Sequence, residues 1–115
     1  MHEASITESI MESAIAELEK SGLTGSVKTV HVTTGVCQGL IPESMQMYYD
    51  MEKPGTPLED SELVITVQPM VARCPACGVD RELDIPVMFC PECGGTMEMI
   101  KGKEILITSI EVEDE

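Results

Sequence analysis

The chain has 115 residues, enough for one modest domain or for a small domain that carries a metal-stapled module. Its 21 acidic and 7 basic residues give a net charge of −14, and such a surface repels phosphate backbones, which argues against a nucleic-acid partner. No apolar run approaches the roughly 20 residues that cross a bilayer, and the first residues lack a basic segment and an apolar signal core. We therefore expect a cytoplasmic protein with no membrane partner.

Two helices and three strands are predicted outside the cysteine-rich region. Residues 4–21 favour an amphipathic helix, because apolar residues recur every three or four positions from Ile6 to Leu18. Gly22 is a natural helix end, and Pro42 suits the first position of a second helix. The remaining expected elements are strands at 26–34, 62–68 and 104–112, and the second helix is expected to run to about residue 53.

These elements predict an α+β fold in which two separated segments share one sheet. The last strand places Leu106, Thr108, Ile110 and Val112 on one face, where they can complete a three-stranded sheet with two helices. A four-cysteine ribbon is inserted before that strand and can reorient as a body. The expected domain bounds are 1–69 and 103–115 for the helix-bearing domain and 70–102 for the ribbon.

The ribbon contains two copies of a Cys-x-x-Cys-Gly pattern, with eleven residues between them. Each copy is a tight turn that can aim two sulfurs at one metal, with the glycine in a backbone conformation that other residues resist. Four thiolates favour a closed tetrahedral Zn²⁺ site, while disulfides and a rubredoxin-like iron site remain as alternatives. The expected zinc ligands are Cys74, Cys77, Cys90 and Cys93.

The first three residues form a second candidate metal site. The Met1 amine, the His2 amide nitrogen and His2 Nδ1 can close chelate rings around one cation, with the Glu3 amide nitrogen or a carboxylate as fourth donor. A square-planar nitrogen site that displaces amide protons suits Ni²⁺ or Cu²⁺. The alternative is an ordinary surface histidine at a mobile terminus.

Other metal-binding residue types are interpreted as structural. Cys37, in the turn between Gly35 and Gly39, is expected to be a small, half-buried apolar residue. His31 lies among threonines on a strand face and is expected to face solvent. The nine methionines are interpreted as core filler in a chain with one Phe and no Trp, with copper binding as the alternative. No catalytic arrangement is present, which favours a carrier over an enzyme.

Several segments, in matching order over nearly the whole chain, resemble the HypA/HybF family of nickel-insertion accessory proteins in NiFe-hydrogenase maturation. The amino-terminal triplet together with the late double knuckle is the specific part of the resemblance. The matching segments are Met1-His2-Glu3, Glu8-Ser9-Ile10, Gly35, Ala72-Arg73-Cys74-Pro75-Ala76-Cys77-Gly78, Phe89-Cys90-Pro91-Glu92-Cys93-Gly94, Gly102-Lys103-Glu104 and Ile110-Glu111-Val112.

The resemblance implies a nickel domain and a zinc domain. It implies that His2, with the Met1 amine and the Glu3 backbone, carries nickel, and that the four knuckle cysteines carry structural zinc. It also implies delivery to a NiFe-hydrogenase large subunit in cooperation with a HypB-type GTPase. The sequence does not say which enzyme receives the metal, and urease is an alternative to hydrogenase. It also leaves the oligomeric state open, with a homodimer as one possibility.

Three classes of protein therefore remain. The first is a nickel metallochaperone with transient Ni²⁺ and structural Zn²⁺. The second is a zinc-ribbon adaptor that binds protein or nucleic acid, although this chain lacks the basic, aromatic surface of the nucleic-acid binders. The third is a small redox protein with iron in the four-cysteine site, which the visible absorption of ferric thiolate would reveal.

Overall fold

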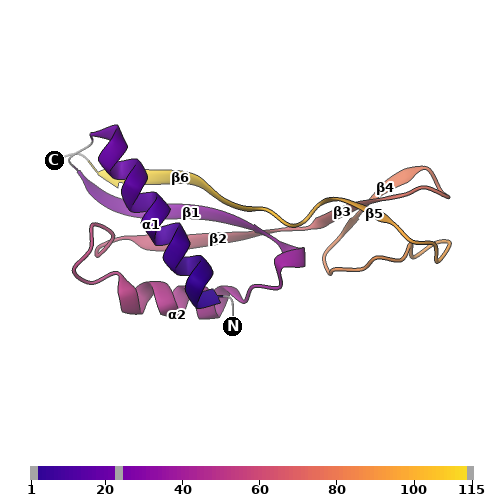
Figure 1. The fold of residues 1–115 in the computed structure, drawn as a ribbon, viewed down its shortest axis with the longest axis horizontal. Helices are drawn as coiled ribbons and strands as arrows, with labels where there is room; N and C mark the ends of the chain where they lie inside the picture. The colour runs from indigo at the N-terminus through magenta and orange to yellow at the C-terminus, as the bar shows by residue number, and fades with distance from the viewer. Residues whose placement is uncertain (1–2, 23–24, 114–115) are drawn as a thin grey trace. The chain divides into compact units, whose positions relative to one another are not determined.

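The structure is a computed structural model that describes residues 3–22 and 25–113. The chain divides into two compact units, and Figure 1 follows it from α1 to β6 through both. Unit 1 comprises Met1–Val32, Leu40–Thr66 and Ile107–Glu115, and unit 2 comprises Thr33–Gly39 and Val67–Leu106. The domain bounds expected from the sequence, 1–69, 70–102 and 103–115, stay predictions.

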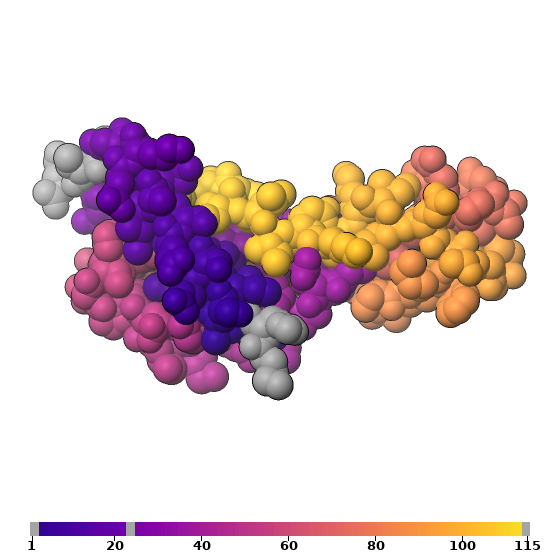
Figure 2. Space-filling model, viewed as in Figure 1, coloured from indigo at the N-terminus to yellow at the C-terminus, as the bar shows by residue number. Residues whose placement is uncertain are grey.

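Unit 1 contains both helices, α1 (Glu3–Ser21) and α2 (Pro42–Glu52), which pack against each other. The space-filling view shows the indigo side chains of α1 beside the magenta side chains of α2 (Figure 2). Ile10, Met11 and Ala14 are buried in α1, which confirms the expected apolar stripe. Both helices lie within one residue of the predicted bounds. None of the helices in residues 3–22 and 25–113 is both long and apolar enough to span a membrane.

The sheet of unit 1 has the strand order β2-β1-β6, so β1 is its central strand. Its members are β1 (Ser26–Gly35), β2 (Glu62–Gln68) and β6 (Ile105–Glu113), close to the predicted ranges. Val30 and Val32 are buried on one face of β1, while His31 between them is partly exposed, as alternation requires. The other buried apolar side chains of this unit come from both helices, β1, β2 and the loop before β2: Ile10, Met11, Ala14, Val27, Met45, Tyr49, Leu58 and Leu63.

The last strand, β6, buries different faces in its two halves. Leu106 is 54% exposed, whereas Ile107, Ile110 and Val112 are half-buried. Because Ile107 and Ile110 are three residues apart, they cannot share a face of a strand whose side chains alternate. The buried face therefore changes along β6, from that of Ile107 in the first half to that of Ile110 and Val112 in the second.

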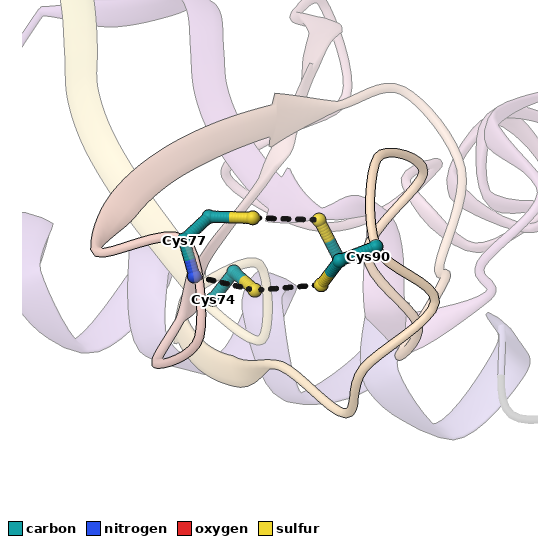
Figure 3. Close-up of side chains that lie close together, drawn as sticks. Cys74, Cys77 and Cys90 are labelled. Carbon is teal, nitrogen blue, oxygen red and sulfur yellow. Dashed lines mark hydrogen bonds between the residues drawn. The ribbon is translucent and has the colours of Figure 1, made fainter.

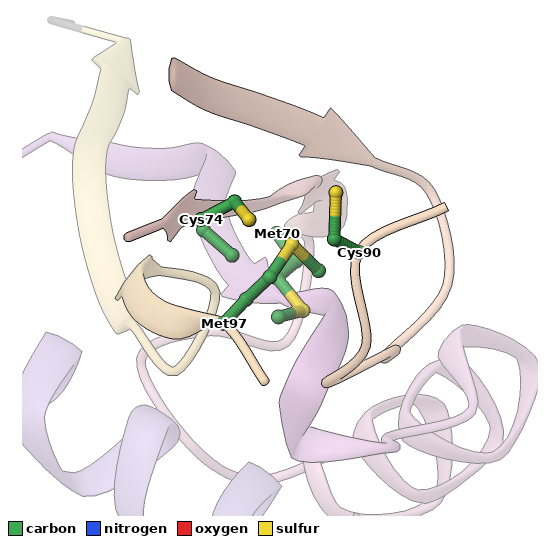
Figure 4. Close-up of a cluster of buried hydrophobic side chains, with 5 residues drawn as sticks. Met70, Cys74, Cys90 and Met97 are labelled. Atoms are coloured by element: carbon green, nitrogen blue, oxygen red, sulfur yellow. The ribbon is translucent and has the colours of Figure 1, made fainter. Parts of the chain in front are cut away.

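Unit 2 holds a second sheet of three short antiparallel strands, in the order β4-β3-β5. These are β3 (Met70–Cys74), β4 (Val79–Leu83) and β5 (Glu98–Lys101). Its buried core is Met70, Ala72, Cys74, Cys90 and Met97, and Figure 4 shows four of these side chains gathered together. Two methionines thus fill this core, in agreement with the expected use of methionine as packing. The two sheets and two helices confirm the predicted α+β fold with a four-cysteine module.

A short 3-10 helix, η1 (Val36–Gln38), packs on the turn after β5. The Gly35 amide donates to the Glu104 carbonyl oxygen at 2.6 Å, and the Cys37 amide donates to the Gly102 carbonyl oxygen at 2.8 Å. A Cβ on Gly35 would lie 2.0 Å from that Gly102 oxygen. A residue with no side chain is therefore required at Gly35.

Candidate metal centre

The first cysteine pair is set by the end of β3 and the turn that follows it. Cys74 is the last residue of β3, and Cys77 lies in the turn before β4. The Cys77 amide donates to Cys74 Sγ at 3.4 Å, and the Gly78 amide donates to the Cys74 carbonyl oxygen at 2.7 Å. Gly78 has a φ of 72°, the left-handed region that glycine enters without steric cost.

The second pair repeats this arrangement without a preceding strand. The Gly94 amide donates to the Cys90 carbonyl oxygen at 2.8 Å, and Gly94 has a φ of 73°. The Gly95 amide donates to Cys93 Sγ at 3.4 Å, and the Cys90 amide closes the loop onto the Gly95 carbonyl oxygen at 2.8 Å. The predicted use of the glycine after each pair is confirmed.

The two pairs face each other, so that all four Sγ atoms lie within 4.8 Å of one another. Cys77 Sγ lies 3.9 Å from Cys90 Sγ, and Cys74 Sγ lies 3.5 Å from Cys93 Sγ. Figure 3 shows the sulfurs of Cys77 and Cys90 pointing at each other across the centre. Cys74 and Cys90 are buried, while Cys77 and Cys93 are exposed, so the centre lies at an edge of the unit 2 core.

The distances and the donor set fit a tetrahedral thiolate metal site. A metal with bonds of about 2.3 Å to four sulfurs places those sulfurs roughly 3.8 Å apart, close to the separations seen here. A disulfide needs sulfurs about 2.0 Å apart, and all five cysteines are free thiols. The core around the site is built of methionine and other aliphatic side chains, while Phe89 is 63% exposed, unlike the aromatic core expected around rubredoxin-like iron.

The thiols of this centre do not ionise alike when no metal is bound. The backbone N–H groups of Cys93 and Glu92 lower the pKa of Cys90 to about 6, against an opposing effect of burial. The neighbouring Cys74 and Cys93 side chains raise the pKa of Cys77 to about 12. The low pKa of Cys90 favours its thiolate at neutral pH, whereas the Cys77 proton must leave when a cation binds.

The expected amino-terminal site is described only at Glu3, because Met1 and His2 lie outside the described residues. Glu3 is the first residue of α1 and is buried. Its Oε2 atom accepts a hydrogen bond of 3.0 Å from the amide of Ile41, the residue before α2. This contact links the start of α1 to the start of α2. The sequence did not predict it, because a buried carboxylate at a chain end has no local signal.

The other candidate ligands, His31 and Cys37, make different contacts. His31 Nε2 lies 2.5 Å from Glu111 Oε1, on the neighbouring strand of the unit 1 sheet. Cys37 is half-buried and packs against the core of unit 2, as expected for a small apolar residue. Neither belongs to the four-cysteine group, which is the cluster of metal-ligating side chains found within the described ranges.

Comparison with known proteins finds that the chain is similar to the members of one family. A family model described as "Hydrogenase/urease nickel incorporation, metallochaperone, hypA" matches residues 1–112. The hydrogenase maturation factor HypA of Aquifex aeolicus is 32% identical, over 98% of this chain and 98% of that protein. The factor of the same name from Caldanaerobacter subterraneus is 36% identical, over 98% of this chain and 100% of that protein. These matches confirm the resemblance seen in the sequence.

Two solved structures share the fold. The solution structure of the Ni metallochaperone HypA from Helicobacter pylori has a TM-score of 0.66 at 19% identity, and the alignment covers 100% of both chains. Another solution structure, of a protein called HypA, has a TM-score of 0.70 at 18% identity, over 100% of this chain and 98% of that one. At these identities the likeness bears on the fold alone.

Proposed function

Because the chain belongs to the HypA family of hydrogenase and urease nickel-incorporation metallochaperones, we propose that it carries Ni²⁺ at its amino terminus and passes it to an immature NiFe-hydrogenase. The family is one of metal carriers, so the chain is not an enzyme. The observation that carries the proposal is the family match from residue 1, which includes the Met1-His2-Glu3 triplet.

The nickel ligands that we propose are the Met1 amine, the amide nitrogen and Nδ1 of His2, and the Glu3 backbone nitrogen. Nitrogen donors in a plane suit Ni²⁺, and fused five- and six-membered chelate rings hold it without a closed cage. The Glu3 carboxylate already accepts the Ile41 amide hydrogen bond, which supports the backbone rather than the side chain as the donor from this residue. That hydrogen bond also holds Glu3 next to the start of α2.

We assign the second metal, Zn²⁺, to Cys74, Cys77, Cys90 and Cys93. Their sulfurs have the spacing and chemistry of a closed structural site, which leaves no open position for a substrate. Bound zinc supplies folding free energy to a unit whose buried core has only five residues. Zinc is therefore resident, whereas nickel is the cargo.

Transfer requires that nickel leave one set of donors for another. An amino-terminal chelate is open on one side, so a partner that offers additional or softer donors can displace its ligands stepwise. We propose that a HypB-type GTPase assists this transfer, that the hydrogenase large subunit receives the ion, and that both steps occur in the cytoplasm, where the cage thiolates stay reduced.

A nickel titration of the full chain tests the site, with the two histidines as a matched pair. We expect His2→Ala to abolish tight nickel binding, because it removes the imidazole from the chelate. His31→Ala should retain it, because His31 pairs with Glu111 in the unit 1 sheet. Equilibrium dialysis with metal analysis gives both affinities and the zinc content. Unchanged nickel affinity in His2→Ala refutes the proposed ligands.

A further inference from the structure

Arg81 occupies an unusual place for a charged residue, on the inner face of the unit 2 sheet. It lies directly opposite Ala72 in the pairing of β3 with β4. Ala72 is fully buried in the core, and residues opposite each other in an antiparallel pair project from the same face. Leu83, two residues along β4 from Arg81, also packs against that core. Arg81 therefore projects toward the side of the sheet that carries Cys74.

Within residues 3–22 and 25–113, the Arg81 side chain forms no ion pair with a carboxylate. Its Nε atom is buried and lacks a hydrogen-bond partner among the described residues. The neighbouring Asp80 projects from the opposite face, where its Oδ1 atom accepts a hydrogen bond of 2.8 Å from Arg73 Nε. Hydrogen bonds to the Cys90 and then the Cys77 sulfur raise the pKa of Arg81, and the Glu92 carboxylate adds a weaker Coulombic effect in the same direction. Burial of an arginine is costly unless such a partner is present.

We propose that Arg81 is a positioning residue of the four-cysteine site, which donates hydrogen bonds to the Cys90 and Cys77 thiolates and balances part of their charge. The inference rests on the proposed zinc site and deepens it. Four thiolates and one Zn²⁺ carry a net charge of −2, and one guanidinium reduces that to −1. Hydrogen bonds from outside the ligand set hold ligands in place and tune their donor strength.

This arrangement has a chemical consequence for a protein that handles two metals. A thiolate that accepts a charge-assisted hydrogen bond is a weaker nucleophile and a weaker target for a competing cation. Cys77 is an exposed cage ligand, so its sulfur is open to attack from solvent. Arg81 thus helps to keep zinc in the cage while nickel is exchanged elsewhere.

Arg81→Gln and Arg73→Gln form a matched pair of variants on adjacent strands. Both remove one positive charge, but Arg73 lies on the outer face, with its side chain 57% exposed and paired to Asp80. Zinc affinity of the full chain is measured by competition with a chromophoric chelator. The Co²⁺-loaded protein is measured by absorption, because the thiolate-to-cobalt charge-transfer energy depends on hydrogen bonds to sulfur.

We expect Arg81→Gln to weaken zinc binding roughly 10- to 100-fold and to move the charge-transfer band to longer wavelength, since removing the hydrogen bond raises the energy of the sulfur lone pair. Arg73→Gln should change the affinity by no more than about fivefold, as for an exposed ion pair, and leave the band in place. Equal affinities and equal bands in the two variants overturn the role of Arg81.

Arg81→Lys, measured in the same way, keeps the test decisive if Arg81→Gln does not fold. It retains the charge but not the planar pair of donors, so the expected result is near-normal affinity with a shifted band. A band identical to that of the unmodified protein in Arg81→Lys contradicts the hydrogen bonds. A wild-type chain that forms no tetrahedral thiolate–cobalt spectrum would instead contradict the zinc site itself.

Discussion

Tyr49 carries the one aromatic hydroxyl that is fully buried in unit 1, and a short chain of hydrogen bonds satisfies it. The Ser61 hydroxyl donates to the Leu58 carbonyl oxygen at 2.6 Å, so the Tyr49 hydroxyl donates to Ser61 Oγ. All three residues are at most 1% exposed. Buried polar groups without partners are costly, and these two hydrogen bonds avoid that cost. They also link the end of α2 to the loop before β2.

Replacing Tyr49 by Phe is expected to lower the free energy of unfolding by about 1 kcal/mol at neutral pH, the value of one buried hydrogen bond. Burial raises the pKa of Tyr49 in the folded state, so folding favours the protonated phenol. That contribution is complete below a pH of about 10 and is lost as the pH rises through the folded-state pKa. The stability difference between wild type and Tyr49→Phe should therefore shrink in alkaline urea titrations.

Tyr48→Phe is the control at neutral pH, because the half-buried Tyr48 donates only a long, solvent-exposed hydrogen bond of 3.4 Å to Glu8 Oε2. It should leave the urea midpoint nearly unchanged. A Tyr49→Phe protein as stable as wild type at neutral pH, or a stability difference that grows with pH, would show that the buried hydroxyl has no such role.

Residue roles were predictable from the sequence where the cause is local. The knuckle turns need cysteine, two intervening residues, cysteine and glycine, and Gly78 and Gly94 take the conformation expected. The Glu3 contact with Ile41 and the position of Arg81 depend on segments that the fold brings together. A signal for Arg81 exists in the alternation of Val79, Arg81 and Leu83, but only the pairing with β3 shows that this face is the inner one.

At the level of elements, the close approach of η1 to the turn after β5 is the tightest constraint in unit 2. Gly35 and Gly102 bring two backbones together, and two hydrogen bonds join the segments. Cys37 is held against Gly102 by this contact, since a Cβ there would lie 3.0 Å from the Cys37 sulfur. The turn therefore ties η1 to the unit 2 core at Met70, the first residue of β3, whereas the metal ligand Cys74 is its last.

Gly35→Ala should destabilise the protein by about 2 kcal/mol or more, because the new methyl group would meet a backbone oxygen that cannot move away easily. Gly22→Ala is the comparison: Gly22 has a φ of 70° but open space around it, so only the backbone strain of about 1 kcal/mol is expected. Urea denaturation measures both. Equal losses in the two variants would contradict the close contact.

Element bounds followed from periodicity to within about one residue, because helix and strand patterns act over a few residues. The sequence did not predict which face of β6 is buried. Leu106 and Ile110 obey the same alternation in the sequence, yet the strand changes its buried face between Ile107 and Ile110. That change depends on what covers each half of the strand, and a single-strand pattern does not contain this information.

Over the whole molecule, each of the two units has its own buried core, and the metal centre lies in unit 2 alone. The sequence alone predicted the four-cysteine cage, since all four ligands come from two short motifs. It offered the amino-terminal chelate as one interpretation of three residues, and the family resemblance made nickel the leading one. The nickel ligands stay a proposal, because Met1 and His2 lie outside the described residues.

Removal of zinc should unfold unit 2 and spare unit 1, because metal binding supplies folding free energy only where the ligands are. The chain has two tyrosines and no tryptophan, and Tyr48 and Tyr49 both lie in unit 1, so near-ultraviolet circular dichroism reports on that unit. Cys74→Ser should lose zinc and the amide protection of β3 to β5 in hydrogen exchange, yet keep the tyrosine signal.

Cys37→Ser provides the matched control, since Cys37 packs against the same core but is not one of the four grouped cysteines. It should retain one zinc per chain and the protection of β3 to β5. Full protection of these strands in zinc-free Cys74→Ser would contradict the structural role of the metal.

The central claim is that one chain holds two metals on two unrelated sets of donors, nickel on nitrogen at the amino terminus and zinc on sulfur in the cage. X-ray absorption at the nickel edge of the zinc-loaded, untagged protein tests it most directly. The account predicts a planar shell of nitrogen or oxygen donors around nickel, with no sulfur and with zinc retained. A nickel–sulfur shell, or loss of zinc as nickel binds, would contradict it.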